Sequence, residues 1–158
     1  MKEKEEENFS IINQTKGKLP GLSFVNILKE IKKEILGEDY SLSIVYVSEK
    51  KSREINRNYR QKDNPTNILS FPLSKKSGEI LLCPNVIKRE APNFDKNFEG
   101  WLGFLVIHGT LHLKGMQHSD RMEEAEKKYD KKYFDRNRYG ISNDKNSRRR
   151  ISSGRKKS

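Results

Sequence analysis

The chain has 158 residues, a net charge of +11 and a single cysteine, Cys83. This length suits one domain with its own core, and a lone cysteine excludes an intramolecular disulfide and a cysteine zinc ribbon. No stretch approaches the ~20 consecutive apolar residues of a membrane span. The N-terminal letters MKEKEEENFS lack the apolar segment of a signal peptide, so the expected location is the cytoplasm.

The first half of the chain predicts an alternation of strands and helices. A strand is expected over 9–15, followed by an amphipathic helix whose apolar residues, at three- and four-residue spacing, run from Phe24 to Ile35. The β-branched residues of 41–47 predict a second strand. Ser48 then has the side chain to cap a short charged helix that ends near Asn58.

The second half predicts two more strands and two more helices. Strands are expected over 66–72 and 78–83, with Cys83 as a small buried residue at the end of the second. The apolar segment 98–115 predicts a largely buried helix that Gly115 ends. A last helix is expected from Asp120 through Tyr133, with Asp120 as its cap. These elements indicate an α+β domain with helices packed on a sheet of three or four strands.

The charge divides the chain into three parts. Residues 1–8 form a charged extension, 9–135 the folded domain, and 136–158 a basic tail with nine lysines or arginines against one aspartate. The tail is poor in apolar residues, which predicts disorder. It is either a solvated extension without a specific role or an electrostatic arm for nucleic-acid phosphates.

All three histidines of the chain fall within the eleven residues HGTLHLKGMQH. His108 and His112 are four apart on the predicted helix, so their imidazoles share one face and can reach one ion. Gly115 lets the chain turn back, which would allow His118 to supply a third ligand. Three imidazoles with an open fourth position are typical of a catalytic zinc site.

The residue after the first histidine separates this pattern from a zinc peptidase. Peptidases of the H-E-x-x-H type need a glutamate there as general base, and this chain has Gly109. A catalytic zinc can activate water by itself, so ester hydrolysis remains possible. A phosphodiester substrate would need a cation for its oxygens, and Arg60 and Lys62, just before the strand at 66, are candidates that could equally be solvated surface charges.

Three motifs together carry a resemblance: NYRQKDNPTNILSFP, then GEI at 78–80, then HGTLHLKGMQH. They resemble the successive signatures of the YbeY family, zinc-dependent endoribonucleases that mature ribosomal RNA in bacteria, and the match in element order spans about 9–133. The resemblance implies a mixed four-stranded sheet, one zinc held by His108, His112 and His118, single-stranded RNA as substrate, and a phosphate contact by Arg60. It also implies 3′-end maturation of small-subunit ribosomal RNA, ribosome quality control, and the small ribosomal subunit or its proteins as partners.

The chain departs from the family signatures at four positions. Asn67 and Glu79 stand where the family usually has aspartate, and Met116 and Gln117 precede the third histidine where the family usually has Tyr-Asp. These changes weaken any assignment of a general base or of a carboxylate partner for a ligand histidine. Glu79 and Asp120 are the remaining candidates for a base, each more typical of a structural role.

Two functions of different classes therefore remain open. The first is a metal-dependent endoribonuclease acting in ribosome assembly. The second is a non-catalytic assembly factor whose zinc stabilises the fold and which binds ribosomal RNA or a ribosomal protein. A metallopeptidase is disfavoured by Gly109.

Overall fold

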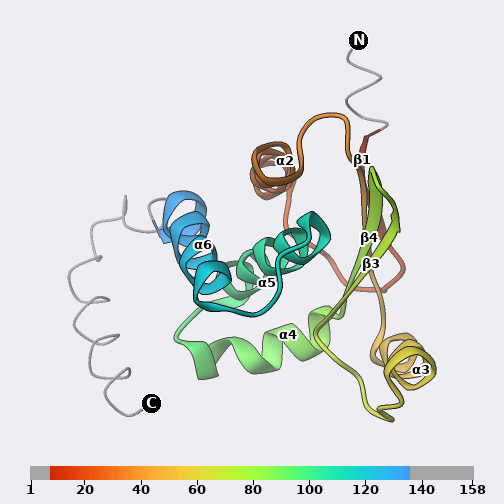
Figure 1. Cartoon of the computed structure of the whole chain (residues 1–158). Coiled ribbons are helices and arrows are strands. Elements are labelled where there is room, and N and C mark those ends of the chain that lie inside the picture. Colours follow the sequence, from red (N-terminus) through yellow and green to blue (C-terminus); the bar gives the residue numbers. More distant parts are fainter. Residues whose placement is uncertain (1–7, 136–158) are drawn as a thin grey trace.

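The computed structural model describes residues 8–135 as one α+β unit (Figure 1). Its elements are β1 (Phe9–Asn13), α2 (Leu22–Leu36), β2 (Ser41–Tyr46), α3 (Glu49–Arg60), β3 (Ile68–Ser74), β4 (Ser77–Leu82), α4 (Pro84–Glu90), a 3₁₀ turn (Ala91–Phe94), α5 (Phe98–Lys114), α6 (Asp120–Asp130) and a π-helical turn (Lys131–Asp135). The predictions for residues 1–7 and 136–158 lie outside the described residues.

The four strands form one mixed sheet in the order β1-β2-β4-β3. β1, β2 and β4 run parallel, and β3 pairs antiparallel with β4 through a tight connection. Because the parallel strands share a direction, their carboxyl ends lie at one end of the sheet, beside the start of β3. The mixed four-stranded sheet is therefore confirmed.

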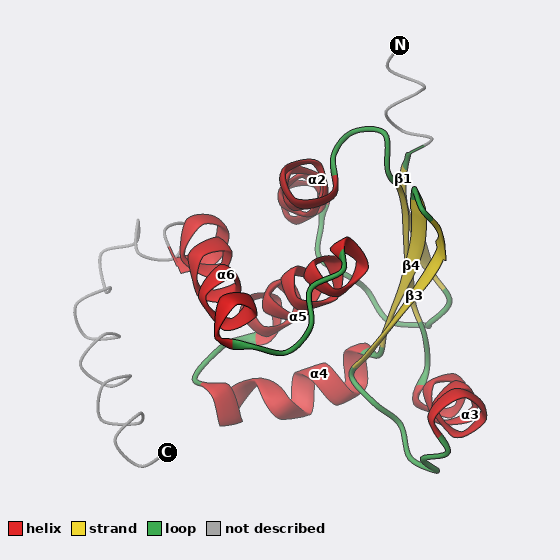
Figure 2. Cartoon of the chain, viewed as in Figure 1, coloured by secondary structure: helices red, strands yellow, loops and turns green. Residues whose placement is uncertain are grey.

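The two faces of the sheet carry helices of different kinds. α2 and α5 cover one face, with α6 packed against α5, whereas α3 lies on the other face (Figure 2). The first face holds the main core, where Leu28, Ile44 and Ile107 are fully buried. The second core is small and consists of Val45, Val47, Leu69 and Leu81 with Ile55 and Phe71 against them.

Helix α5 lies deepest in the molecule because small residues allow it to approach its neighbours. A Cβ atom on Gly109 would lie 2.9 Å from Ser70 Oγ and 3.0 Å from Ile80 Cδ1, so the glycine permits close packing on the sheet. A Cβ atom on Gly103 would overlap the ring of Phe134. Gly115 ends the helix in the left-handed region, with φ of 109°, as expected for a glycine stop.

The sequence-based boundaries hold with local corrections. The strand expected over 66–72 is β3, shifted two residues later, because 66 and 67 belong to the preceding loop. Helix α4 and the turn after it were missed, since a seven-residue helix leaves too short a periodic pattern. Ser119 rather than Asp120 caps α6, accepting a hydrogen bond from Met122 N. Among residues 8–135, no helix is long and apolar enough to cross a membrane.

Candidate metal centre

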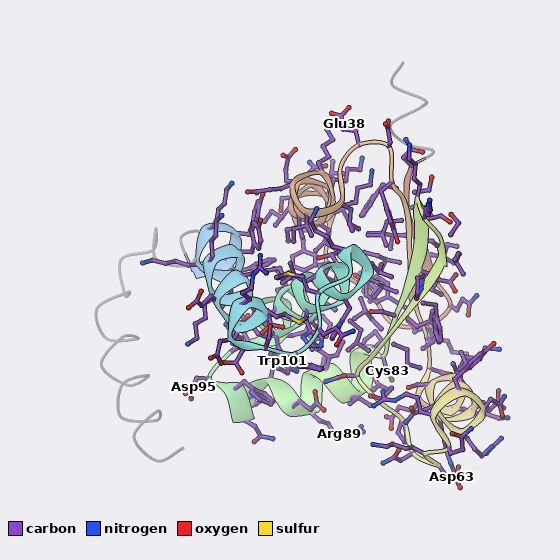
Figure 3. The ribbon with its side chains drawn as sticks, in the orientation of Figure 1. Glu38, Asp63, Cys83, Arg89, Asp95 and Trp101 are labelled. Atoms are coloured by element: carbon purple, nitrogen blue, oxygen red, sulfur yellow. The ribbon has the colours of Figure 1, made fainter. Side chains whose placement is uncertain are left out.

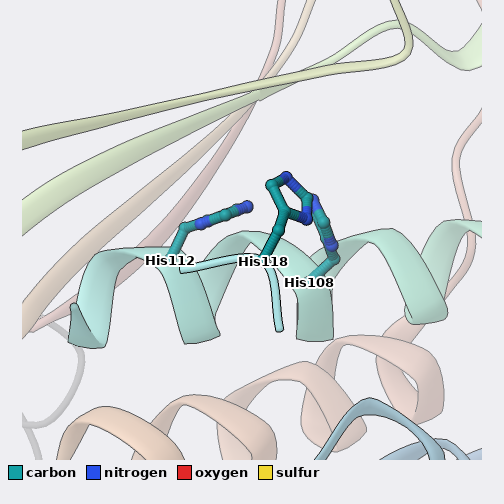
Figure 4. Close-up of side chains that lie close together, drawn as sticks. All are labelled: His108, His112 and His118. Carbon is teal, nitrogen blue, oxygen red and sulfur yellow. The ribbon is translucent and has the colours of Figure 1, made fainter. Parts of the chain in front are cut away.

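The structure brings the three histidines together. His108 and His112 extend from one face of α5, and His118 reaches the same point from the loop after Gly115 (Figure 4). One ligand nitrogen from each histidine lies within 4.8 Å of the others. The ring centroids are 4.5 to 5.4 Å apart. Nitrogens this close can converge on one ion at about 2.0–2.1 Å each after small side-chain movements.

Hydrogen bonds at Nδ1 of His108 and His112 determine which ring nitrogen remains available to a metal. His108 Nδ1 lies 2.5 Å from Glu126 Oε2, and His112 Nδ1 lies 3.0 Å from the carbonyl oxygen of Met116. A carboxylate and a carbonyl only accept, so each Nδ1 carries the hydrogen and donates it. The Nε2 lone pairs of His108 and His112 are therefore left for a metal, which is the usual arrangement behind ligand histidines.

The electrostatics also suit a metal. Burial, with a smaller contribution from the neighbouring His108, lowers the pKa of His112 below its ordinary value. His112 is therefore neutral at neutral pH, and the neutral imidazole is the form that binds a metal. Among the described residues, no other histidine, cysteine, aspartate or glutamate joins the group. The donor set thus consists of three nitrogens.

Glu126 contacts the histidine cluster, and the sequence-based prediction missed it. It lies on α6 one turn after Met122, on the side that faces α5, and its side chain is only 11% exposed. The sequence did contain a signal for Glu126, because it falls on the apolar face of an amphipathic helix. A carboxylate that is buried in this way needs a hydrogen-bond or ionic partner. The family signatures had directed attention to positions 67, 79 and 117, of which only 79 carries a carboxylate in this chain.

Arg60 lies apart from this cluster in the sequence, at the end of α3, and its side chain is exposed. The same helix carries Arg53 and Arg57, which both contact Asp63. Figure 3 labels Asp63 in the loop that follows this helix. Arg60 has no ion pair within residues 8–135, so its guanidinium is available to an incoming anion. Lys62 is likewise exposed.

The loop from Arg60 to β3 is fixed by polar contacts on both sides. Ser52 Oγ accepts from Thr66 N and donates to Thr66 O, both at 2.9 Å. Asn67 Nδ2 donates to Glu90 Oε1 at 2.9 Å, and Trp101 Nε1 donates to the same oxygen at 3.0 Å. The amide at 67 matches the carboxylate at 90, because an aspartate in its place would repel it.

Three further residues that were considered from the sequence, Glu79, Asp120 and Cys83, lie outside the histidine cluster. Gly78 and Ile80 face α5, so Glu79 between them points to the opposite face of the sheet, away from the histidines. Asp120 is exposed in the first turn of α6. Cys83 is buried just after β4, as expected, and burial raises the pKa of its thiol.

Comparison with known proteins gives a consistent family. The family model described as endoribonuclease YbeY matches residues 6–136. A relative of that name from Thermotoga maritima is 40% identical over 110 residues, covering 65% of this chain and 73% of the relative. One from Thermotoga neapolitana is 36% identical over 125 residues, covering 78% and 83%.

A solved structure agrees with these sequence matches. The solution structure of a Thermotoga maritima protein covers 84% of this chain and 93% of its own, at 33% identity and a TM-score of 0.60. The family match spans most of the chain and includes β1, the three histidines and Glu126. The resemblance seen in the motifs is thereby confirmed, and the chain belongs to the YbeY endoribonuclease family.

Proposed function

We propose that this protein is a metal-dependent endoribonuclease that cuts single-stranded RNA. The observation that carries the proposal is the convergence of His108, His112 and His118 in a member of a family whose relatives are named endoribonucleases. Residues 9–135 are proposed as the hydrolase domain. The group offers three nitrogens and, within the described part of the chain, no fourth protein ligand, which favours an open catalytic site over a closed structural one.

Zinc is the metal that this donor set suits best. Imidazole nitrogens suit zinc and other first-row transition metals, whereas magnesium and calcium prefer oxygen ligands. When bound, zinc would supply Lewis acidity for phosphodiester hydrolysis. The protein's own contribution is to orient the ligands: Glu126 holds the ring of His108, and the Met116 carbonyl holds that of His112.

Arg60 is proposed to bind a phosphate group of the RNA. Its support is a guanidinium at an exposed helix end that forms no ion pair with any residue from 8 to 135, together with the similarity of NYRQKDNPTNILSFP to the family signature. A guanidinium can hold two phosphate oxygens at once, which would fix the strand at the site. The basic residues of 136–158 are proposed to add salt-dependent affinity for RNA.

In the cell, the proposed substrate is the 3′ end of small-subunit ribosomal RNA, with further roles in ribosome quality control in the cytoplasm. The proposed partners are ribosomal RNA and the small ribosomal subunit or its proteins. This biological assignment is supported by membership of the family and by the net charge of +11, which suits a polyanionic partner.

The test is cleavage of a labelled RNA that contains the 3′ end of the small-subunit RNA, single-stranded or annealed to its complement. We expect the single strand to be cut, the duplex to be spared, and chelation followed by zinc addition to stop and restore cutting. A protein that binds zinc but leaves the RNA intact, also when ribosomal particles are supplied, would instead be a non-catalytic assembly factor.

A further inference from the structure

A cavity of about 810 Å³ lies at the carboxyl ends of the three parallel strands. Its walls come from the loops that follow β1 and β2, from α4 and from the first residues of α5, and it shares no residue with the histidine cluster. In Figure 1 the chain leaves β2 for α3 and β4 for α4 at this same end of the sheet. Ligands of sheets with parallel strands bind preferentially beyond the carboxyl ends of those strands.

The charge of this cavity is positive. Lys16, Lys18 and Lys88 line it, against one acidic residue, Glu99. All three lysines are exposed, and within residues 8–135 none of them forms an ion pair. Lys88 Nζ lies 5.8 Å from the centre of the Phe98 ring, which positions its ammonium group without neutralising it. Three ammonium groups against one carboxylate give the cavity a net positive charge, which favours an anionic ligand.

The loop that presents two of these lysines is held in shape before any ligand arrives. Asn13 Oδ1 accepts from Thr15 N at 2.8 Å and from Thr15 Oγ1 at 2.6 Å. Asn13 Nδ2 donates to the carbonyl of Gly17 at 3.0 Å. These bonds close the turn around Lys16, so binding an anion there costs little backbone ordering.

The remaining wall suits a nucleotide rather than a bare ion. Leu19, Val47 and Phe98 give the cavity an apolar side, of which Phe98 is partly exposed and aromatic. Two long helices, α3 and α5, begin at the cavity, and the positive ends of their dipoles add to the attraction for phosphate. The volume lies within the usual range for small-molecule sites, about 300–1,000 Å³.

We propose that this cavity binds a nucleotide of an RNA strand, with its phosphate at Lys16, Lys18 and Lys88 and its base along the apolar side. The choice of RNA rests on the proposed function, but binding at this site does not require cleavage. Phe98 precedes His108 by ten residues on α5, which is about 15 Å along a helix axis. The cavity would therefore hold RNA at a distance from the histidines and give the strand a second point of attachment.

The first experiment maps binding of uridine 5′-monophosphate and of inorganic phosphate by backbone-amide NMR shifts on the full-length protein. Neither probe has an internucleotide bond, so the outcome is independent of cleavage. We expect both to shift the amides of 14–18, with the nucleotide adding shifts at Phe98. Shifts confined to the histidine loop, or none at millimolar probe, would overturn the proposal.

The second experiment compares two triple variants with the same change in charge. K16Q/K18Q/K88Q removes the cavity lysines, and K75Q/K76Q/K127Q removes three exposed lysines elsewhere and serves as the control. Binding of a labelled single-stranded oligouridylate is followed in EDTA, which stops a metal-dependent reaction. We expect the slope of log K against log salt to fall by about 0.7 in the cavity variant, the value for one lost phosphate contact on a single strand, and to stay unchanged in the control.

If both triple variants lose the same amount of RNA affinity, the cavity lysines contribute only through the overall charge of the protein. That result would overturn the proposed site. Cleavage at saturating RNA is measured separately on the same proteins. If the protein cuts no RNA but the cavity variant still loses binding selectively, the proposed hydrolysis fails while the nucleotide site stands. If cutting is normal and the two triple variants bind RNA alike, the nucleotide site fails while the proposed hydrolysis stands.

Discussion

Helices α5 and α3 carry the two halves of the proposed active site, and they are held in place by different forces. α5 packs by apolar burial, with Leu102, Val106 and Ile107 fully buried. The buried side of α3 instead includes Ser52 and Asn56, which hydrogen-bond the loop before β3. Two of the proposed ligands, His108 and His112, thus stand on a rigid scaffold, whereas Arg60 stands on an exposed polar helix. Changes on one helix should leave the role of the other intact.

The largest effect is expected for His112→Ala. Removing one of three ligands should abolish stoichiometric zinc binding and lower RNA cleavage by at least about a thousandfold, while the circular dichroism spectrum is retained. Metal analysis and cleavage rates measured on one preparation check this. Undiminished cleavage by a metal-free variant would remove the histidines from the chemistry.

Arg60→Ala should lower the cleavage rate by about 10²–10³-fold, the usual loss for one group that stabilises transition-state charge. Zinc content should stay the same, and stability should change by no more than about 0.5 kcal/mol because the side chain is exposed. Arg57→Ala is the matched control, since Arg57 lies on the same helix but contacts Asp63. Equal rates for the two variants would place Arg60 outside the site.

Glu126→Gln should weaken zinc binding by about 10–100-fold, because the amide is a poorer acceptor for the His108 Nδ1 hydrogen. Competition with a chromophoric chelator measures the affinity. Glu123→Gln, on the exposed side of the same helix, is the control. An affinity that Glu126→Gln leaves unchanged would mean that Glu126 serves the packing of α6 alone.

Gly109→Ala should destabilise the protein by about 1–3 kcal/mol through overpacking, because the added methyl group meets Ser70 and Ile80 at 2.9–3.0 Å. Urea unfolding measures the loss. The result also bears on the missing peptidase glutamate, since a side chain at 109 would point into the sheet. An unchanged free energy of unfolding would show that α5 packs less tightly on the sheet than its burial suggests.

The smallest effect is expected for Asn56→Ala, about 1–2 kcal/mol in the same unfolding experiment. The change removes the hydrogen bond from Asn56 Nδ2 to Asn64 O, which is 2.8 Å long. The exposed Asn58→Ala is its control. If α3 is held mainly by its few apolar contacts, both variants will unfold alike.

The same difference between the helices explains what the sequence predicted well. The apolar period of 98–115 and the spacing of the histidines directly predicted α5 and the face that carries His108 and His112. Ser48 was likewise found as a cap because its role is local, and it accepts a hydrogen bond from Lys51 N. Local patterns determine such features, so one sequence suffices to find them.

Features that depend on contacts between distant segments were not predictable in the same way. Glu126 meets His108 across eighteen residues, and Glu90 meets Asn67 across twenty-three. Helix α4 is too short for its period to be recognised. The cavity lysines come from two separate segments that only the parallel strand order brings together. The resemblance to a family predicted the mixed four-stranded sheet, but it did not predict these contacts between distant residues.

The proposed metal centre requires that His108, His112 and His118 together hold one zinc ion with an open position. Its most direct test is zinc titration of the full-length protein followed by X-ray absorption of the loaded sample. We expect one zinc per chain with three imidazole nitrogens at about 2.0–2.1 Å and a further ligand from solvent. A zinc shell completed by a fourth protein ligand, or no stoichiometric zinc at all, would contradict it.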